Sequence, residues 1–300
     1  MLKVAFSPSY VLSLPLNHRF PMSKYEVLPA QLLHEGTLNQ DNFFKPETID
    51  EKWILRTHEE AYWLKLKTLS LTPKEVRRTG FPLTHELIQR EITIMNGTLQ
   101  AVDFAVQYGV AMNIAGGTHH AFTNKGEGFC LLNDIAIAAN YALDQKLANK
   151  VLIIDLDVHQ GNGTAQIFRH DDRVFTFSMH GANNYPMVKE HSDLDIGLPD
   201  FTDDKFYLKT LATNLDNIME KFYPDLIFFQ SGVDVLATDK LGKLSLTQEG
   251  CKTRDRIVLE LAHKNKIPLV ASMGGGYSTD FKDIINAHAN TYRLAQQIFF

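Results

Sequence analysis

Two aspartates and a histidine alternate with apolar residues in the segment DLDVH at residues 155–159. An extended backbone points alternate side chains to the same side, so Asp155, Asp157 and His159 would share one edge of a strand. Asp234 follows a second apolar run. Carboxylates and imidazole are ligands of catalytic zinc sites, which keep one position open for substrate. Asp157, His159 and Asp234 are therefore candidate zinc ligands, although solvated acids at a strand end would give the same triplet.

Two adjacent histidines, His119 and His120, follow a glycine pair at residues 116–117. Glycines let the backbone approach a site closely, and paired histidines beside metal ligands suit general acid–base catalysis. Tyr277 likewise follows three glycines at 274–276. A turn made of glycines is free to adopt unusual backbone angles, so it could direct the phenol of Tyr277 toward the metal ligands. Each feature also has a purely structural interpretation, as a hydrogen-bonded core histidine or as a plain glycine turn.

Short apolar runs alternate with amphipathic stretches along the chain, and these elements must position the residues described above. We predict strands over 4–7, 110–115, 151–157, 174–178, 226–231 and 268–272. We predict helices over about 86–108, 132–144, 205–222, 247–265 and 279–297. Several strands are apolar on successive residues, which is typical of parallel strands covered on both faces. The sequence therefore predicts a single α/β domain over residues 1–300, with an open, mostly parallel sheet flanked by helices.

The composition is that of an ordinary globular protein, because 44% of the 300 residues are hydrophobic and 22% are charged. The net charge is −5, whereas proteins that bind double-stranded nucleic acid are usually basic. We therefore expect no direct nucleic acid binding. Two cysteines, Cys130 and Cys251, make no disulfide framework and favour a reducing compartment. No apolar run is long enough to span a membrane and no secretion signal is visible, so we expect a cytoplasmic protein.

Four sequence motifs together resemble the histone deacetylase superfamily, which has the arginase/deacetylase fold. They are GGTHHA at 116–121, GEGFCLLND at 126–134, DLDVHQGNG at 155–163 and GGGY at 274–277. The match runs in the expected order from about residue 15 to residue 295. Two segments, HQGNG at 159–163 and DKLGKLSLT at 239–247, are most similar to the class IV and bacterial branch of the superfamily.

The resemblance implies one catalytic zinc ion held by Asp157, His159 and Asp234. His120 would be the general base for the attacking water. Tyr277 would donate its hydroxyl to the oxyanion that develops on the acyl carbonyl.

The resemblance also implies supporting residues around this centre. Asp155 would hold His119, which would give electrostatic support and assist the leaving group. A structural potassium ion would be bound by the side chains of Asp155 and Ser178 and by backbone carbonyls that include that of Met179.

A tunnel for the acyl-lysine side chain is a further implication of the resemblance. Phe129, next to Gly128, would form one wall of the tunnel, and Gly275 would lie near its foot. Tyr185 is a candidate for the second wall. Arg19 resembles an arginine that lines the inner product channel.

One residue departs from the pattern of class I enzymes. Asn162 occupies the position where those enzymes carry an aspartate behind the second histidine. An amide can orient the imidazole of His120 but supplies no charge. The resemblance therefore implies that His120 is a weaker base here than in class I.

The sequence predicts a zinc-dependent hydrolase that removes acetyl or longer fatty-acyl groups from the N-acyl-lysine of a protein or peptide. Class IV relatives prefer long chains, which favours medium or long acyl groups, although Phe20 and Met22 could fill the foot of the tunnel. A small acylated amine, such as an acylpolyamine, is an alternative substrate. Arginase-like ureohydrolysis with two manganese ions is a second alternative, and a catalytically silent acyl-lysine reader is a third.

Overall fold

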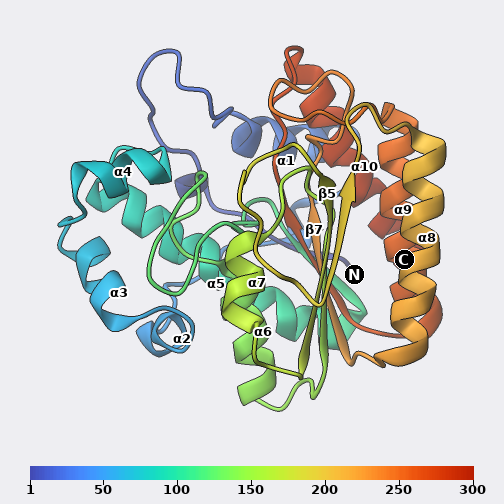
Figure 1. Cartoon of the computed structure of the whole chain (residues 1–300), viewed down its shortest axis with the longest axis horizontal. Coiled ribbons are helices and arrows are strands. Elements are labelled where there is room, and N and C mark those ends of the chain that lie inside the picture. The colour runs from blue at the N-terminus through green and yellow to red at the C-terminus, as the bar shows by residue number, and fades with distance from the viewer.

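Eight parallel strands form one open sheet in the computed structural model, which describes residues 1–300 (Figure 1). The strands are β1 (Lys3–Ala5), β2 (Phe43–Phe44), β3 (Val110–Asn113), β4 (Val151–Asp155), β5 (Val174–Gly181), β6 (Leu194–Leu198), β7 (Leu226–Ser231) and β8 (Leu269–Met273). Their order is β2-β1-β3-β8-β7-β4-β5-β6, and every neighbouring pair is parallel. The carboxyl ends therefore meet at one edge, where open α/β sheets bind ligands.

Helices cover both faces of this sheet. They are α1 (Lys24–His34), α2 (Glu51–Leu55), α3 (Glu60–Lys67), α4 (Pro73–Thr79), α5 (His85–Tyr108), α6 (Asp134–Asp144), α7 (Asn162–Phe168), α8 (Asp204–Lys221), α9 (Gln248–Asn265) and α10 (Phe281–Phe299). Figure 1 shows α8, α9 and α10 on one side of the sheet and α5, α6 and α7 on the other. This is the layered arrangement that a parallel sheet requires, because both of its faces are apolar.

The central strands bury side chains on both faces, as their unbroken apolar runs predict. Val151 and Ile153 of β4 join the hydrophobic cluster that contains α5 and α6 residues. Leu152 and Ile154 of the same strand join the larger cluster that contains residues of α8, α9 and α10. Since successive side chains alternate between faces, one strand ties both helical layers to the sheet.

The longest helix, α5, has clear signals at both ends. The Oγ1 atom of Thr84 accepts a hydrogen bond from the backbone N–H of Leu87 at 3.1 Å, which satisfies one free donor of the first turn. Gly109 follows the last turn with φ +90°, a conformation that few other residues adopt. The helix predicted over 86–108 therefore occurs within one residue of its expected bounds.

The predicted fold class is confirmed, and each predicted strand and helix occurs within a few residues of its expected position. One difference matters for the site, because the strand predicted over 151–157 ends at Asp155. The N–H of Asp157 donates to Asp155 Oδ1 at 3.2 Å, and that of Val158 donates to Asp234 Oδ1 at 2.9 Å. Asp157 and His159 therefore lie in the loop after β4, rather than along the strand itself.

Hydropathy along the helices gives one further result. None of them combines the length and the apolar character that crossing a membrane demands.

Candidate active site

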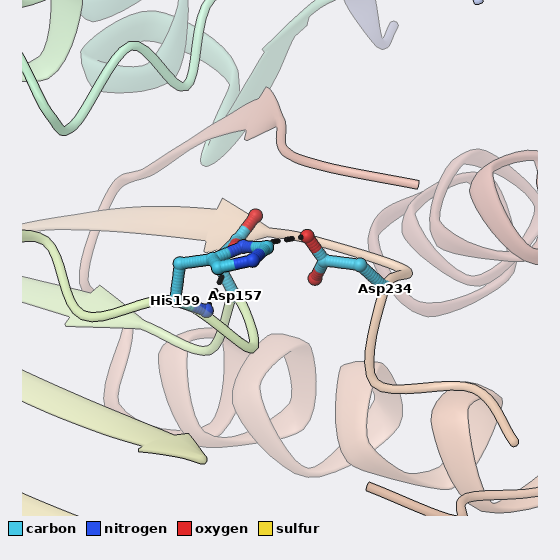
Figure 2. Close-up of side chains that lie close together, drawn as sticks. All are labelled: Asp157, His159 and Asp234. Carbon is cyan, nitrogen blue, oxygen red and sulfur yellow. Dashed lines mark hydrogen bonds and ion pairs between the residues drawn. The ribbon is translucent and has the colours of Figure 1, made fainter. Parts of the chain in front are cut away.

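Three candidate metal ligands converge beyond the carboxyl ends of two adjacent strands, β4 and β7 (Figure 2). The Nδ1 atom of His159 lies 3.0 Å from Asp157 Oδ1 and 3.2 Å from Asp234 Oδ2. The three ligand atoms lie within 4.8 Å of one another. The structure thus brings together the three residues that the sequence proposed for zinc.

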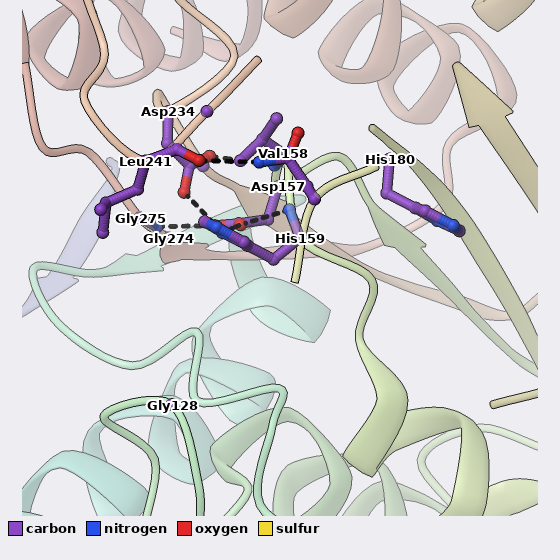
Figure 3. Close-up of polar contacts among 12 residues, drawn as sticks. Gly128, Asp157, Val158, His159, His180, Asp234, Leu241, Gly274 and Gly275 are labelled. Atoms are coloured by element: carbon purple, nitrogen blue, oxygen red, sulfur yellow. Dashed lines mark hydrogen bonds and ion pairs between the residues drawn. The ribbon is translucent and has the colours of Figure 1, made fainter. Parts of the chain in front are cut away.

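Backbone amides fix the orientation of both carboxylates (Figure 3). The N–H of Gly275 donates to Asp157 Oδ2 at 2.7 Å, and the N–H of Val158 donates to Asp234 Oδ1 at 2.9 Å. A Cβ atom at Gly275 would lie 1.9 Å from Asp234 Oδ2, so no side chain fits at this position. Asp157 Oδ1 also accepts from the backbone N–H of His159 at 3.0 Å. Both oxygens of Asp157 and one oxygen of Asp234 are therefore held by the backbone.

The chemistry of this group fits a metal cation. Asp234 Oδ2 is buried and accepts no hydrogen bond. Burial, together with the neighbouring charge of Asp157, raises the pKa of Asp234 to about 7. Two adjacent buried carboxylates are unfavourable unless a positive charge compensates them. One nitrogen and two carboxylate ligands, with an open side toward a cavity, suit a catalytic zinc ion.

His119 and His120 lie side by side, with ring centroids 4.1 Å apart, but they have different partners. His119 Nδ1 lies 2.7 Å from Asp155 Oδ2. Burial lowers the pKa of His119, but the charges of Asp155 and Asp157 outweigh it and raise that pKa to about 9. His119 therefore holds a proton at neutral pH.

His120 Nδ1 lies 2.7 Å from the side-chain oxygen of Asn162. Because that oxygen only accepts, Nδ1 carries the hydrogen and Nε2 is left with a free lone pair. Burial and the positive charge of His119 hold the pKa of His120 well below its usual value. His120 is therefore a neutral imidazole that can accept a proton.

Tyr277 follows the glycine turn after β8, and its backbone N–H donates to Asp239 Oδ2 at 2.6 Å. Its ring centroid lies 6.2 Å from that of Phe129 and 6.3 Å from that of Phe20. Burial and the charges of Asp234 and Asp157 raise the pKa of Tyr277 well above its usual value. Its hydroxyl therefore stays protonated and remains a hydrogen-bond donor.

A cavity of about 490 Å³ connects these residues to the surface. Its lining includes exposed Arg77 and Arg78, then Phe129, Tyr185, His120, His159 and Tyr277, and finally buried Tyr25, Arg90 and Ile94. The ring of Tyr185 stands edge-on to that of His120, with centroids 5.1 Å apart. Phe129 and Tyr185 thus both border the passage, and Gly128 between them also lines it.

The predicted potassium ligands lie close together on adjacent strands. Asp155 and Ser178 are register partners on β4 and β5, and Met179 follows Ser178. Ser178 Oγ lies 3.0 Å from His180 Nδ1, and Figure 3 shows His180 turned away from the metal ligands.

Arg19 lines the cavity but is an exposed residue, which differs from the inner position expected of it. Two buried cations line the cavity instead, Arg90 and Lys24. The ammonium of Lys24 donates to the carbonyl of Gly274 at 3.0 Å. Burial lowers the pKa of Lys24 to about 8. Sequence reasoning missed this residue, because nothing near it distinguishes Lys24 from a surface lysine.

Glu127 is a second residue for which no role was evident from the sequence. It lies inside the GEGFC motif, but its partners come from distant segments of the chain, at Asn162 and Tyr185. Cys130 of the same motif is buried, and burial raises the pKa of its thiol well above the usual value, so it is no nucleophile.

Comparison with known proteins places this site in a family. Residues 18–292 match the histone deacetylase domain. An uncharacterized protein from Picosynechococcus is 42% identical over 296 residues, covering 99% of both chains. Histone deacetylase 2 from Arabidopsis thaliana is 30% identical over 287 residues, covering 91% of this chain and 74% of that protein.

A solved structure shows the same fold. The crystal structure of a histone deacetylase homolog from Aquifex aeolicus superimposes with a TM-score of 0.83 at 24% identity, covering 98% of this chain and 84% of the other. The domain match spans nearly the whole sheet and all the residues gathered at its carboxyl edge. The chain therefore belongs to the histone deacetylase family of hydrolases.

Proposed function

We propose that the protein is a zinc-dependent deacylase that hydrolyses the amide bond of an N-acyl-lysine. The observation that carries this proposal is the convergence of a three-ligand metal site, a neutral histidine and a protonated tyrosine on one cavity. The cavity is walled by Phe129 and Tyr185, which suits a long, thin side chain. An acyl-lysine presents such a chain, with the reacting amide at its far end.

Each step of the hydrolysis has a residue suited to it. Asp157, His159 and Asp234 would hold the zinc ion, which would supply a Lewis acid for the carbonyl and for the attacking water. His120 Nε2 accepts the proton of the attacking water, since its Nδ1 already donates to Asn162.

Collapse of the tetrahedral intermediate breaks the C–N bond and needs a proton on the leaving amine. His119 can supply it, because the carboxylate of Asp155 keeps its imidazole protonated. Tyr277 donates its hydroxyl to the oxygen that becomes negative during attack.

The buried part of the cavity would determine which acyl groups fit. Besides the metal ligands, the cavity is lined by the buried residues Tyr25, Arg90 and Ile94. This space supports acyl groups longer than acetyl, while Phe20 narrows the passage by packing against Phe129 and Tyr277. We propose medium-chain acyl-lysine as the preferred substrate and potassium as the ion beside Asp155 and Ser178.

A ureohydrolase with two catalytic metal ions has less support. Only one group of three or more potential ligands converges in the structure, and Asp234 is followed by valine and leucine. A second ion would need further carboxylates to bridge it to the first.

The experiment that tests the proposed function measures metal content and turnover together. The purified protein should hold about one zinc ion per chain and hydrolyse a lysine peptide carrying acetyl, octanoyl or myristoyl. Asp157→Ala is the matched control and should lose both metal and activity. Two catalytic ions per chain, or metal without turnover of any acyl-lysine, would overturn the proposal, and a steady fall in kcat/KM with chain length would leave an acetyl-lysine deacetylase.

A further inference from the structure

Glu127 connects the catalytic base to the wall of the tunnel. Its side chain is only 10% exposed. One carboxylate oxygen, Oε1, accepts a hydrogen bond from the amide of Asn162 and another from the hydroxyl of Tyr185, both at 2.8 Å. The other oxygen, Oε2, lies 3.4 Å from the ammonium of Lys125. None of the proposed steps of the hydrolysis uses this buried acid.

The contact with Asn162 decides which way the asparagine amide points. An asparagine can present either its oxygen or its NH₂ group to a neighbour, and the two orientations have almost the same shape. A carboxylate only accepts hydrogen bonds, so Glu127 must face the NH₂ group. The oxygen of Asn162 is therefore left to face His120.

The orientation of Asn162 in turn decides the tautomer of His120. With the asparagine oxygen in front of it, Nδ1 must carry the hydrogen, and Nε2 has the lone pair. A reversed amide would favour the opposite tautomer, in which Nε2 carries the hydrogen and cannot accept a proton from water.

We propose that Glu127 is a positioning residue that sets the base tautomer of His120 through Asn162. This inference rests on the proposed function, since it concerns the same base. It also changes the consequence of the asparagine at position 162. The carboxylate that class I enzymes carry directly behind the histidine stands here one residue further away, with an amide between.

The competing explanation is that Glu127 only anchors its own loop. The loop is short and constrained, because Gly128 has φ +57° and Phe129 has φ +66°. The ion pair with Lys125 would serve such an anchor equally well. A purely structural acid would change stability when replaced, but it would show no specific coupling to position 162.

A double-mutant cycle separates the two explanations. In Asn162→Asp, the hydrogen bond from position 162 to Glu127 is lost, and two carboxylates that can only accept hydrogen bonds face each other. We expect kcat to fall by at least about tenfold. In Glu127→Gln the fall should be about threefold, because a glutamine amide accepts the same two hydrogen bonds in only one orientation.

The combined variant Asn162→Asp/Glu127→Gln reverses donor and acceptor between the two positions. The glutamine NH₂ would donate to the new aspartate, which still accepts from His120 Nδ1. We expect kcat to recover at least about fivefold above Asn162→Asp alone, with KM little changed. Lys125→Gln is the matched control, and it should leave kcat unchanged because it removes only the partner of Oε2.

The tautomer itself can be observed without turnover. Imidazole ¹⁵N shifts distinguish a hydrogen on Nδ1 from one on Nε2, and a His120→Ala spectrum assigns the signal among the 12 histidines. The wild type and the combined variant should carry the hydrogen on Nδ1, whereas Glu127→Leu should give a mixture. A folded Glu127→Leu with Nδ1 fully protonated, or a combined variant no better than Asn162→Asp, would refute the role of Glu127. Absence of acyl-lysine turnover with the expected tautomers would instead count against the proposed function alone.

Discussion

At the scale of single residues, the two adjacent histidines differ because their Nδ1 atoms face different partners. The carboxylate of Asp155 keeps a proton on His119, whereas the amide oxygen of Asn162 leaves His120 neutral. The pKa of His119 is raised to about 9, and that of His120 is held well below its usual value. His119 can therefore act as an acid and His120 as a base, although both are histidines and their ring centroids lie only 4.1 Å apart.

Replacing the tyrosine hydroxyl tests its role as an oxyanion donor. Tyr277→Phe keeps the ring against Phe129 but removes the donor, so kcat should fall about 10²–10³-fold. Metal content and thermal stability should stay at wild-type values, which a melting curve and elemental analysis would check. A kcat within about twofold of the wild type would remove Tyr277 from the mechanism.

The buried carboxylate pair makes a prediction about the metal-free protein. The folded pKa of Asp234 is raised to about 7, so the folded state binds the extra proton between pH 4 and pH 7. In that window the contribution of Asp234 to stability falls as pH rises, because its carboxyl binds fewer protons in the unfolded state. Asp234→Asn should therefore raise the Tm of the metal-free protein at pH 7, while abolishing metal binding.

Thermal scans with a chelator at pH 7 and near pH 4 would check this. The gain from Asp234→Asn should shrink at the lower pH, where the wild-type carboxyl is protonated. A variant whose Tm stays below that of the wild type at both pH values would contradict the explanation.

Much of the site could be predicted from the sequence because the residues that hold metal and protons have characteristic types and spacing. Asp157 and His159 are two residues apart, and Asp234 follows an apolar strand. Glu127 and Lys24 could not be assigned in this way. Their roles depend on partners more than 30 residues away, such as Asn162 and Gly274, and no local pattern specifies those contacts.

At the scale of elements, apolar periodicity predicted the long helices and the central strands. It failed for β6, whose residues Leu194–Leu198 are mostly half-exposed because it lies at the edge of the sheet. It also failed for β2, α2, α3, α4 and α7, which have two to eight residues and are too short for a repeated apolar face. It failed as well for α1, which has Pro29 in its interior. Edge and surface elements depend on neighbours more than on their own pattern.

An ion pair between helices gives a prediction at this scale. Arg293 of α10 donates to both carboxylate oxygens of Glu35, which caps α1, at 2.8 and 2.5 Å. These hydrogen bonds hold the pKa of Glu35 at about 2. Glu35→Gln should lower the free energy of unfolding by about 0.5–1 kcal/mol at pH 7, since the pair is partly screened by solvent.

The effect should depend on pH in a defined direction. A lowered folded pKa stabilises the protein above the unfolded value of 4.5, and this contribution is lost as pH falls toward 2. Denaturant unfolding of the wild type and Glu35→Gln should therefore converge in acid. Glu260→Gln, which breaks an exposed pair with Arg256, is the control and should have little effect at any pH. A difference between wild type and Glu35→Gln that is constant across pH would exclude the ion pair as its cause.

At the scale of the whole molecule, the charge of the cavity mouth opposes the charge of the chain. The protein carries −5 overall. Around the mouth, however, stand the exposed residues Arg19, Arg77, Arg78 and Lys243, and the only acidic residue that lines the cavity is Asp157. The three arginines have no ion pair or side-chain hydrogen bond.

The positive charge around the cavity mouth predicts a preference for peptides with acidic residues beside the acyl-lysine. An acyl-lysine flanked by Asp and Glu should have a kcat/KM about tenfold higher than one flanked by Lys and Arg at low salt. The ratio should shrink in 0.5 M salt, where the screening length falls to about 4–5 Å. Arg77→Glu/Arg78→Glu should reduce or reverse the preference, and equal rates for both peptides at low salt would rule it out.

The strand order has a consequence for how the chain is made. β8 is the only link between β2-β1-β3 on one side and β7-β4-β5-β6 on the other, and it is the last strand in the sequence. While a ribosome synthesises residues 1–268, β3 and β7 each lack a neighbour, and unpaired strand edges pair readily with other chains. The sheet closes only when Leu269–Met273 emerges. The two halves of the sheet therefore cannot join in the nascent chain until β8 is made, and until then the edges of β3 and β7 stay open to other chains.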